Sequence, residues 1–299
     1  MLRWAIAATA VLVMSLSSST AAANINSTDP SDPADVRDDR DLDGLPDDGG
    51  PVGGTGTHSA GLPMSGHFLY DRSHGGFISL GDFANYLVSQ GWTYTERTEG
   101  ELSSAVLADV DILFLMGGTT PFTPEELAAV SGFLENGGGL WMVHDYLGYA
   151  GVVNQVSEPL GITFHNDSIF GWPLVTEILP HPVSDGVTEY TFYAGSCLEV
   201  RPPGWLLARL SSGSTLYCPE TPGVMAIWDE GAGRGVFQSD ATPLYSSYFP
   251  ENLSEEHLRL LDNILIWLLG TGPIATESAT WGGIKASYRS PSATLGGRP

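Results

Sequence analysis

The chain has 299 residues, of which 35 are Asp or Glu and only 12 are Lys or Arg, giving a formal net charge of −23 at pH 7. So much negative charge repels a phosphate backbone and excludes ordinary nucleic-acid binding. Hydrophobic residues make up 42% of the chain, which is enough for one sizeable core and excludes disorder throughout.

The first 23 residues have the layout of a secretory signal peptide. Arg3 provides a basic start, an apolar run follows over residues 4–16, and small residues end the segment at Ala23. The apolar run is shorter than the ~20 residues that a membrane span needs. We therefore expect cleavage near Ala23 and a secreted or periplasmic mature protein without a membrane span.

Residues 24–65 form an acidic linker that is too poor in large apolar side chains to fold by hydrophobic burial. Within the linker, carboxylates at alternate positions are followed by Gly44, which resembles the start of a calcium loop of the thrombospondin type 3 or dockerin kind. If calcium binds, we expect the ligands to be Asp39, Asp41, Asp43 and Asp47. A solvated acidic linker is the alternative, because only one copy of the pattern occurs and Gly50 stands where an EF-hand has Glu.

From residue 66 to residue 270, strand patterns alternate with helix patterns. Glycines end the first two helices, while Thr123 and Ser254 provide N-caps for two others. The expected strands span residues 67–70, 92–97, 111–116, 140–143, 162–165, 190–200, 205–211, 224–228 and 235–238. The expected helices span residues 80–90, 124–136 and 255–269. This alternation predicts an α/β fold of the flavodoxin-like kind, a mainly parallel sheet with helices on both faces. Residues 271–299 are expected to be a flexible tail.

Export would place Cys197 and Cys218 in an oxidising compartment. Each cysteine lies near the edge of a run that is typical of a strand. We therefore expect a disulfide that staples a hairpin and contributes about 3 kcal/mol.

Polar residues follow several of the predicted strands, and parallel strands bind ligands at their carboxyl ends. Asp71 and His74 follow the first strand, His144 and Asp145 follow the fourth, and Asp240 follows the last. Such a set could perform acid/base chemistry or hold a divalent metal, with His74 as a further ligand. The alternative is structural, because acids at strand ends often cap helices.

Three segments together resemble the class I glutamine amidotransferase-like superfamily. They are DVDILFLMGG at residues 109–118, FTPEE at 122–126 and GGGLWMVHD at 137–145. The resemblance covers roughly residues 66–270 and implies the flavodoxin-like fold. Within the superfamily, the chain is most similar to uncharacterised exported domains and to trehalose-utilisation-type proteins, which implies a carbohydrate-linked role.

The chain departs from the amidotransferase pattern at the catalytic positions. His144 stands where amidotransferases have the nucleophilic Cys, and the sequence from Ser239 to Ala241 replaces the His-Pro-Glu motif. Glutamine hydrolysis is therefore excluded. Neither a Gly-x-Gly-x-x-Gly fingerprint nor a phosphate-binding P-loop is present, so no nucleotide cofactor is expected.

Together these patterns predict a non-catalytic module that binds a carbohydrate or a protein ligand, with a candidate calcium segment beside it. Aromatic residues are dense in the second half of the domain, including Phe170 and Trp172, and exposed aromatics can stack on sugar rings. Packing in the core or against loops is the expectation for most of them, because aromatic side chains are mainly buried. The alternative is a metal-assisted or acid/base enzyme acting on carbohydrate through His144, Asp145, Asp240 and Asp71.

Overall fold

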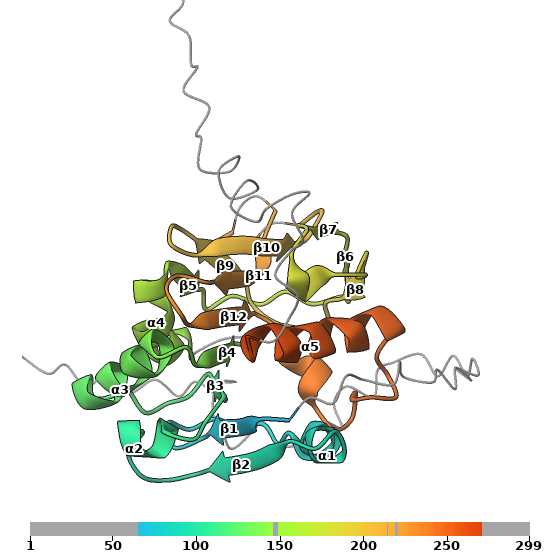
Figure 1. The fold of residues 1–299 in the computed structure, drawn as a ribbon. Helices are drawn as coiled ribbons and strands as arrows, with labels where there is room; N and C mark the ends of the chain where they lie inside the picture. Colours follow the sequence, from blue (N-terminus) through green and yellow to red (C-terminus); the bar gives the residue numbers. More distant parts are fainter. Residues whose placement is uncertain (1–64, 146–148, 214, 219–220, 271–299) are drawn as a thin grey trace, which may run out of the picture. The chain divides into compact units, whose positions relative to one another are not determined.

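The computed structural model describes residues 65–145, 149–213, 215–218 and 221–270. The predicted signal peptide, acidic linker and tail lie outside the described residues. A ten-stranded sheet runs through the described domain, in the order β2-β1-β3-β4-β12-β11-β10-β7, with β9 paired to β11 and β5 paired to β9 (Figure 1).

Five neighbouring strands in this sheet are parallel. They are β2 (Thr93–Arg97), β1 (His67–Asp71), β3 (Ile112–Met116), β4 (Gly139–Val143) and β12 (Arg234–Gln238). All five residues of both β3 and β4 are buried, as expected for strands that are covered on both faces. The predicted parallel α/β sheet is confirmed in this part of the domain.

Beyond β12 the sheet continues with antiparallel strands. They are β11 (Gly223–Trp228), β10 (Trp205–Arg209), β7 (Glu177–Ile178), β9 (Leu198–Val200) and β5 (Ile162–Phe164). The short strands β6 (Leu174–Val175) and β8 (Tyr190–Thr191) pair separately. The expected single strand over residues 190–200 is therefore wrong, because residues 192–197 leave β8 and pass over the end of β12 before β9 begins.

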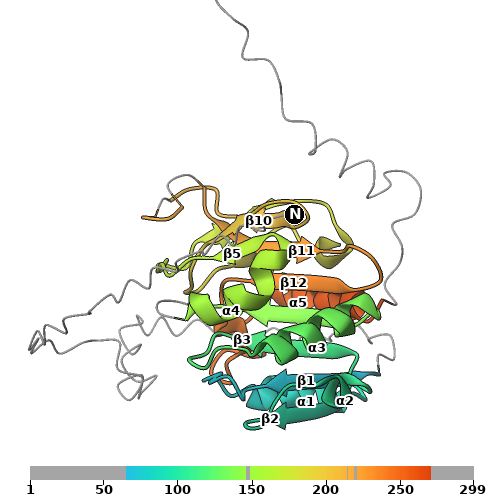
Figure 2. The same ribbon diagram turned by 90° about the vertical axis from the view of Figure 1, so that its left-hand side faces the viewer.

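Helices cover both faces of the sheet (Figures 1 and 2). One face packs against α1 (Gly81–Ser89) and α5 (Glu255–Leu268), through side chains such as Phe83 and Ile264. The other face packs against α2 (Ser104–Leu107), α3 (Pro124–Glu135) and α4 (Ala150–Ser157). Short 3₁₀ turns complete the path at η2 (Glu158–Leu160), η3 (Pro182–Ser184) and η4 (Thr242–Leu244).

The predicted N-caps are both present. The Thr123 side chain accepts a hydrogen bond from the Glu126 amide, and the Glu126 carboxylate accepts one from the Thr123 amide, which completes a capping box. Ser254 accepts from the His257 amide at the start of α5. Neither α2 nor α4 was predicted. α2 has only four residues, although Ser103 caps its start, and α4 has no side-chain cap.

Cys197 and Cys218 form the expected disulfide. The bond does not staple a hairpin, however. It joins the residue before β9 to the loop between β10 and β11, and so holds this loop against the strand that pairs with β11 at Gly223.

Removing the disulfide should destabilise the domain. We expect the Cys197→Ala, Cys218→Ala variant to lose about 3 kcal/mol of unfolding free energy, because the cross-link restricts the unfolded chain. Urea denaturation with and without a reducing agent measures this loss. The reducing agent should lower the urea midpoint of the wild-type protein and leave that of the double variant unchanged. Equal urea midpoints for the two proteins without reducing agent would contradict the prediction.

Candidate functional site

The predicted site residues lie at one edge of the sheet, as their places after parallel strands require. None of Asp71, His74, His144, Asp145 and Asp240 is more than 5% exposed. They separate into three groups rather than one constellation. No group of three or more His, Cys, Asp or Glu residues in the described part of the chain is arranged to hold a metal ion.

The first group surrounds His74. Its Nε2 lies 3.3 Å from Glu126 Oε1 and 3.9 Å from Asp71 Oδ2, while its Nδ1 lies 3.0 Å from the Thr120 carbonyl oxygen. Arg97 Nη1 lies 3.3 Å from Asp71 Oδ1. Glu126 lies in the first turn of α3, and its partnership with His74 could not be read from the sequence.

Electrostatics in this group favour an ionised Glu126. Burial acts to raise its pKa, but hydrogen bonds from the Thr123 and Leu102 amides outweigh burial, and the pKa is lowered from its usual value. Burial raises the pKa of Asp71, although Ser73 and Arg97 oppose the rise. The group ties the β1–α1 loop to the β3–α3 loop, because the Thr120 amide also donates to the His74 carbonyl oxygen at 3.0 Å.

The second group is His144 alone. Its ring packs edge-on against Phe164, and it lies so close to Gly117 that a Cβ there would be 3.2 Å from the Nδ1 atom. Burial lowers the pKa of His144 to about 4, so the ring is neutral at physiological pH. His144 therefore packs into the apolar layer under α4.

The third group is the pair of carboxyl groups at Asp145 and Asp240. Because successive residues of an extended chain face opposite sides, Asp145 points away from His144 and toward the α5 face. Its Oδ2 accepts a hydrogen bond of 2.6 Å from the Tyr245 hydroxyl. Asp240 accepts from the backbone amides of Tyr193 at 2.7 Å and Thr242 at 2.9 Å.

Both carboxyl groups in the pair hold protons more tightly than usual. Burial and the neighbouring Asp240 raise the pKa of Asp145 to about 8, which the Tyr245 hydroxyl only partly opposes. Burial raises the pKa of Asp240 to about 7, against the lowering effect of the amides that it accepts from. Carboxyl groups with such values can act as acids or bases near neutral pH.

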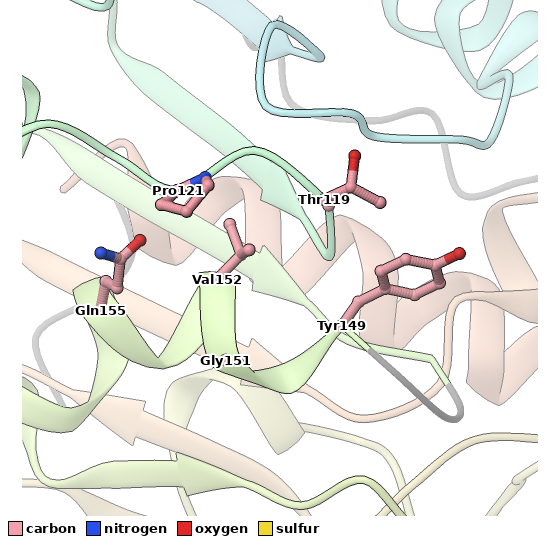
Figure 3. Close-up of a pocket in the computed structure, with 7 residues that line it drawn as sticks. Thr119, Pro121, Tyr149, Gly151, Val152 and Gln155 are labelled. Atoms are coloured by element: carbon pink, nitrogen blue, oxygen red, sulfur yellow. The ribbon is translucent and has the colours of Figure 1, made fainter. Parts of the chain in front are cut away.

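An open pocket of about 350 Å³ lies at the same edge of the sheet, between the β3–α3 loop and α4. Figure 3 shows Thr119 and Pro121 on the loop, facing Val152 on the helix. The lining residues are Gly118, Thr119, Pro121, Tyr149, Gly151, Val152 and Gln155. None of the five predicted site residues is among them, and no lining residue carries a charge.

Hydrogen bonds hold the pocket walls in place. Gln155 Oε1 accepts from the Phe122 amide at 2.9 Å, which fastens α4 to the loop. At the opposite end, the ring of Phe77 lies 5.5 Å from the ring of Tyr149, and Phe77 is 39% exposed. This pocket was not predicted because α4 was not predicted, although Ala150, Val153 and Val156 recur at helical spacing.

The predicted calcium ligands Asp39, Asp41, Asp43 and Asp47 lie outside the described residues. Among the described helices, none combines the length and the apolar character needed to cross a membrane. Among the aromatic residues in the second half of the domain, Phe170 is 62% exposed and Trp172 is 43% exposed, whereas Tyr190, Phe192, Tyr193 and Phe249 are buried.

Several solved structures have a similar fold. A structure described as the mmIFT52 N-terminal domain is 18% identical, with a TM-score of 0.55, over 68% of this chain and 97% of that one. Cytoplasmic protein STM1381 from Salmonella typhimurium LT2 is 16% identical, with a TM-score of 0.51, over 69% and 99%. A ThuA-like protein from Bacteroides uniformis is 14% identical, with a TM-score of 0.48, over 76% and 97%.

These likenesses show a shared α/β fold. The sequence matches no protein-family model, and no curated protein matches it at a significant level. Function therefore has to be argued from the site itself.

Proposed function

We propose that the domain is a non-catalytic binding module of an exported protein, and that it takes a neutral carbohydrate in the pocket between the β3–α3 loop and α4. The observation that carries this proposal is the uncharged lining of a pre-formed pocket at the carboxyl edge of the sheet. The residues best suited to catalysis are buried elsewhere.

The chemistry of the pocket suits a neutral, hydroxyl-bearing ligand. Thr119, Tyr149 and Gln155 offer polar groups, while Pro121 and Val152 offer apolar surface. Phe77 extends the aromatic surface beside Tyr149, and aromatic rings stack on the apolar faces of sugars. The resemblance to trehalose-utilisation-type proteins agrees with this class of ligand, and the disulfide agrees with export.

Filling the pocket should abolish binding. Gly151 lines the pocket in α4, and a Cβ at this position meets no atom within 4 Å, so Gly151→Leu can add bulk on the pocket side without a contact at its Cβ. Gly132→Leu in α3 is the matched control, because Gly132 has the same free space and lies away from the pocket. Saturation-transfer NMR of the full chain with a panel of neutral mono- and disaccharides measures binding. We expect binding by wild type and by Gly132→Leu, with at least about a tenfold loss in Gly151→Leu.

Absence of binding by wild type, or equal binding by all three proteins, would overturn the proposal. Recovery of the sugars unchanged is also expected.

A second candidate function is an acid/base enzyme acting on carbohydrate. The raised pKa values of Asp145 and Asp240 favour it. In that case a sugar from the panel would be converted, and Asp145→Asn would stop the conversion while leaving binding intact. His144, Asp71 and His74 belong to this candidate as accessory groups, although they lie in separate groups from the pair.

A further inference from the structure

Asp145 and Asp240 each lie two residues after the end of a strand, and the two strands are neighbours in the sheet. β4 and β12 are parallel, and their last register pair is Val143 with Gln238. The His144 amide continues the ladder by donating to the Gln238 carbonyl oxygen at 2.9 Å. Asp145 and Asp240 are each the second residue beyond that register pair, and the chain bends at Ser239, between Gln238 and Asp240. Both carboxyl groups are buried, and they are near enough for the charge of Asp240 to act on Asp145.

No cation compensates this pair among the described residues. Neither carboxylate takes part in an ion pair with Arg or His there. The titratable groups that face the pair are the phenols of Tyr190, Tyr193 and Tyr245. His257 of α5 packs against Tyr190 and Tyr193, but burial lowers its pKa to about 3, so this ring is uncharged too.

The carboxyl pair joins three separate segments of the chain. Asp145 Oδ2 accepts a hydrogen bond from the Tyr245 hydroxyl, just after η4, while Asp145 Oδ1 accepts no hydrogen bond within the described structure. Asp240 accepts hydrogen bonds from the Thr242 amide at the start of η4 and from the Tyr193 amide in the segment between β8 and β9. A change in the charge of the pair therefore acts on all three segments.

We propose that Asp145 and Asp240 share a proton in the folded protein and act as a pH-operated latch. With the proton in place, the pair fastens residues 193–194 and 242–245 to the end of β4. When both carboxyl groups are ionised, these two segments become loose. The physical cause is repulsion between two like charges in a site of low dielectric. Loss of the shared proton to solvent leaves both carboxylates charged without a counter-ion. The latch goes beyond ligand binding and does not depend on it.

Hydrogen exchange of single amides tests the latch without a ligand. In the wild-type full chain, the protection of the Tyr193 and Thr242 amides, corrected for intrinsic exchange, should fall about tenfold or more between about pH 6 and pH 9. The Asp111 amide, which donates to the His67 carbonyl oxygen on the far side of the sheet, should keep its protection and serves as the internal reference.

Two variants complete the test. Asp145→Asn mimics the protonated carboxyl, since its amide oxygen can still accept from Tyr245, so protection of the two amides should become independent of pH. Asp82→Asn, at an exposed carboxylate in the first turn of α1, should behave as wild type. Unchanged wild-type protection across this range, or an equal fall in Asp145→Asn, would overturn the proposal.

Carbon-13 NMR of the side-chain carboxyl groups gives a second readout that needs no variant. The resonances of Asp145 and Asp240 should titrate together, well above the range of an ordinary Asp. Independent titration of both groups near pH 4 would also overturn the latch.

Discussion

Replacing Gly195 by alanine should prevent the domain from folding stably. A Cβ at this position would lie 1.9 Å from the Ser239 carbonyl oxygen, closer than two such atoms can approach. That oxygen cannot easily move, because it accepts a hydrogen bond from the Ser196 amide and the Ser239 amide donates to Val224 in the neighbouring strand. We expect a loss of at least about 3 kcal/mol of unfolding free energy.

Gly118 offers a second test of the same effect, since a Cβ there would lie 2.1 Å from the His74 carbonyl oxygen. The control is Gly132→Ala, in a helix and with free space around the new Cβ, which should stabilise the domain by up to about 1 kcal/mol. Urea denaturation followed by circular dichroism measures all three variants. Similar midpoints for Gly195→Ala and wild type would contradict the steric account.

The unfolding free energy should fall as pH rises from about 6.5 to 8. Proteins whose carboxyl groups have lowered pKa values in the folded state do not lose stability in this way. Asp145 and Asp240 have pKa values of about 8 and about 7 in the folded state, above the ordinary value near 4. The folded protein therefore holds protons that the unfolded chain releases, and this stability is present at low pH and lost as pH rises through the folded values.

The buried histidines set the lower limit of this window. The pKa values of His144 and His257 are lowered to about 4 and about 3, so below about pH 6.5 the unfolded chain takes up protons that the folded state cannot. Below about pH 6.5 the effect of the histidines on the unfolding free energy therefore cancels that of the carboxyl pair, and stability changes little with pH. Above about pH 6.5 only the pair remains, and we expect a loss of about 2 kcal/mol by pH 8.

Asp145→Asn should remove this loss. The variant should be more stable than wild type at pH 8 and nearly equal to it at pH 6.5, because the neutral amide avoids the second charge. Urea denaturation at both pH values measures the difference, with Asp82→Asn as the control. A wild-type protein that gains stability toward pH 8 would show that the pair is ionised in the folded state.

Local sequence signals predicted the parallel core well. The run of apolar residues in β3 and the N-cap at Thr123 are short-range patterns, and both have the expected form in the structure. The region between β8 and β9 was mispredicted because its path depends on tertiary contacts, namely the Tyr193 amide with Asp240 and the Ser196 amide with Ser239. Apolar composition alone could not show that this segment leaves the strand conformation.

The place of the acidic residues and histidines at one edge of the sheet was predicted, but their grouping and the pocket were not. Strand order and strand ends brought Asp145 and Asp240 to one edge, as expected. Which face each side chain takes depends on the exact end of each strand, since one residue separates His144 on one face from Asp145 on the other. The partnership of His74 with Glu126 joins a loop to a helix more than 50 positions away in the chain, which no local pattern indicates.

The place of β12 in the sheet bears on how the protein is made. β12 lies between β4 and β11, although it comes from residues 234–238 near the end of the domain. During synthesis, β1 to β4 can pair early, but the outer side of β4 stays an open edge until nearly the whole domain has emerged. Such edges invite pairing with other chains, and long-range pairing is slow. A nascent chain of this protein therefore needs protection from aggregation until its last strand arrives, and truncation before residue 234 should leave a product that aggregates.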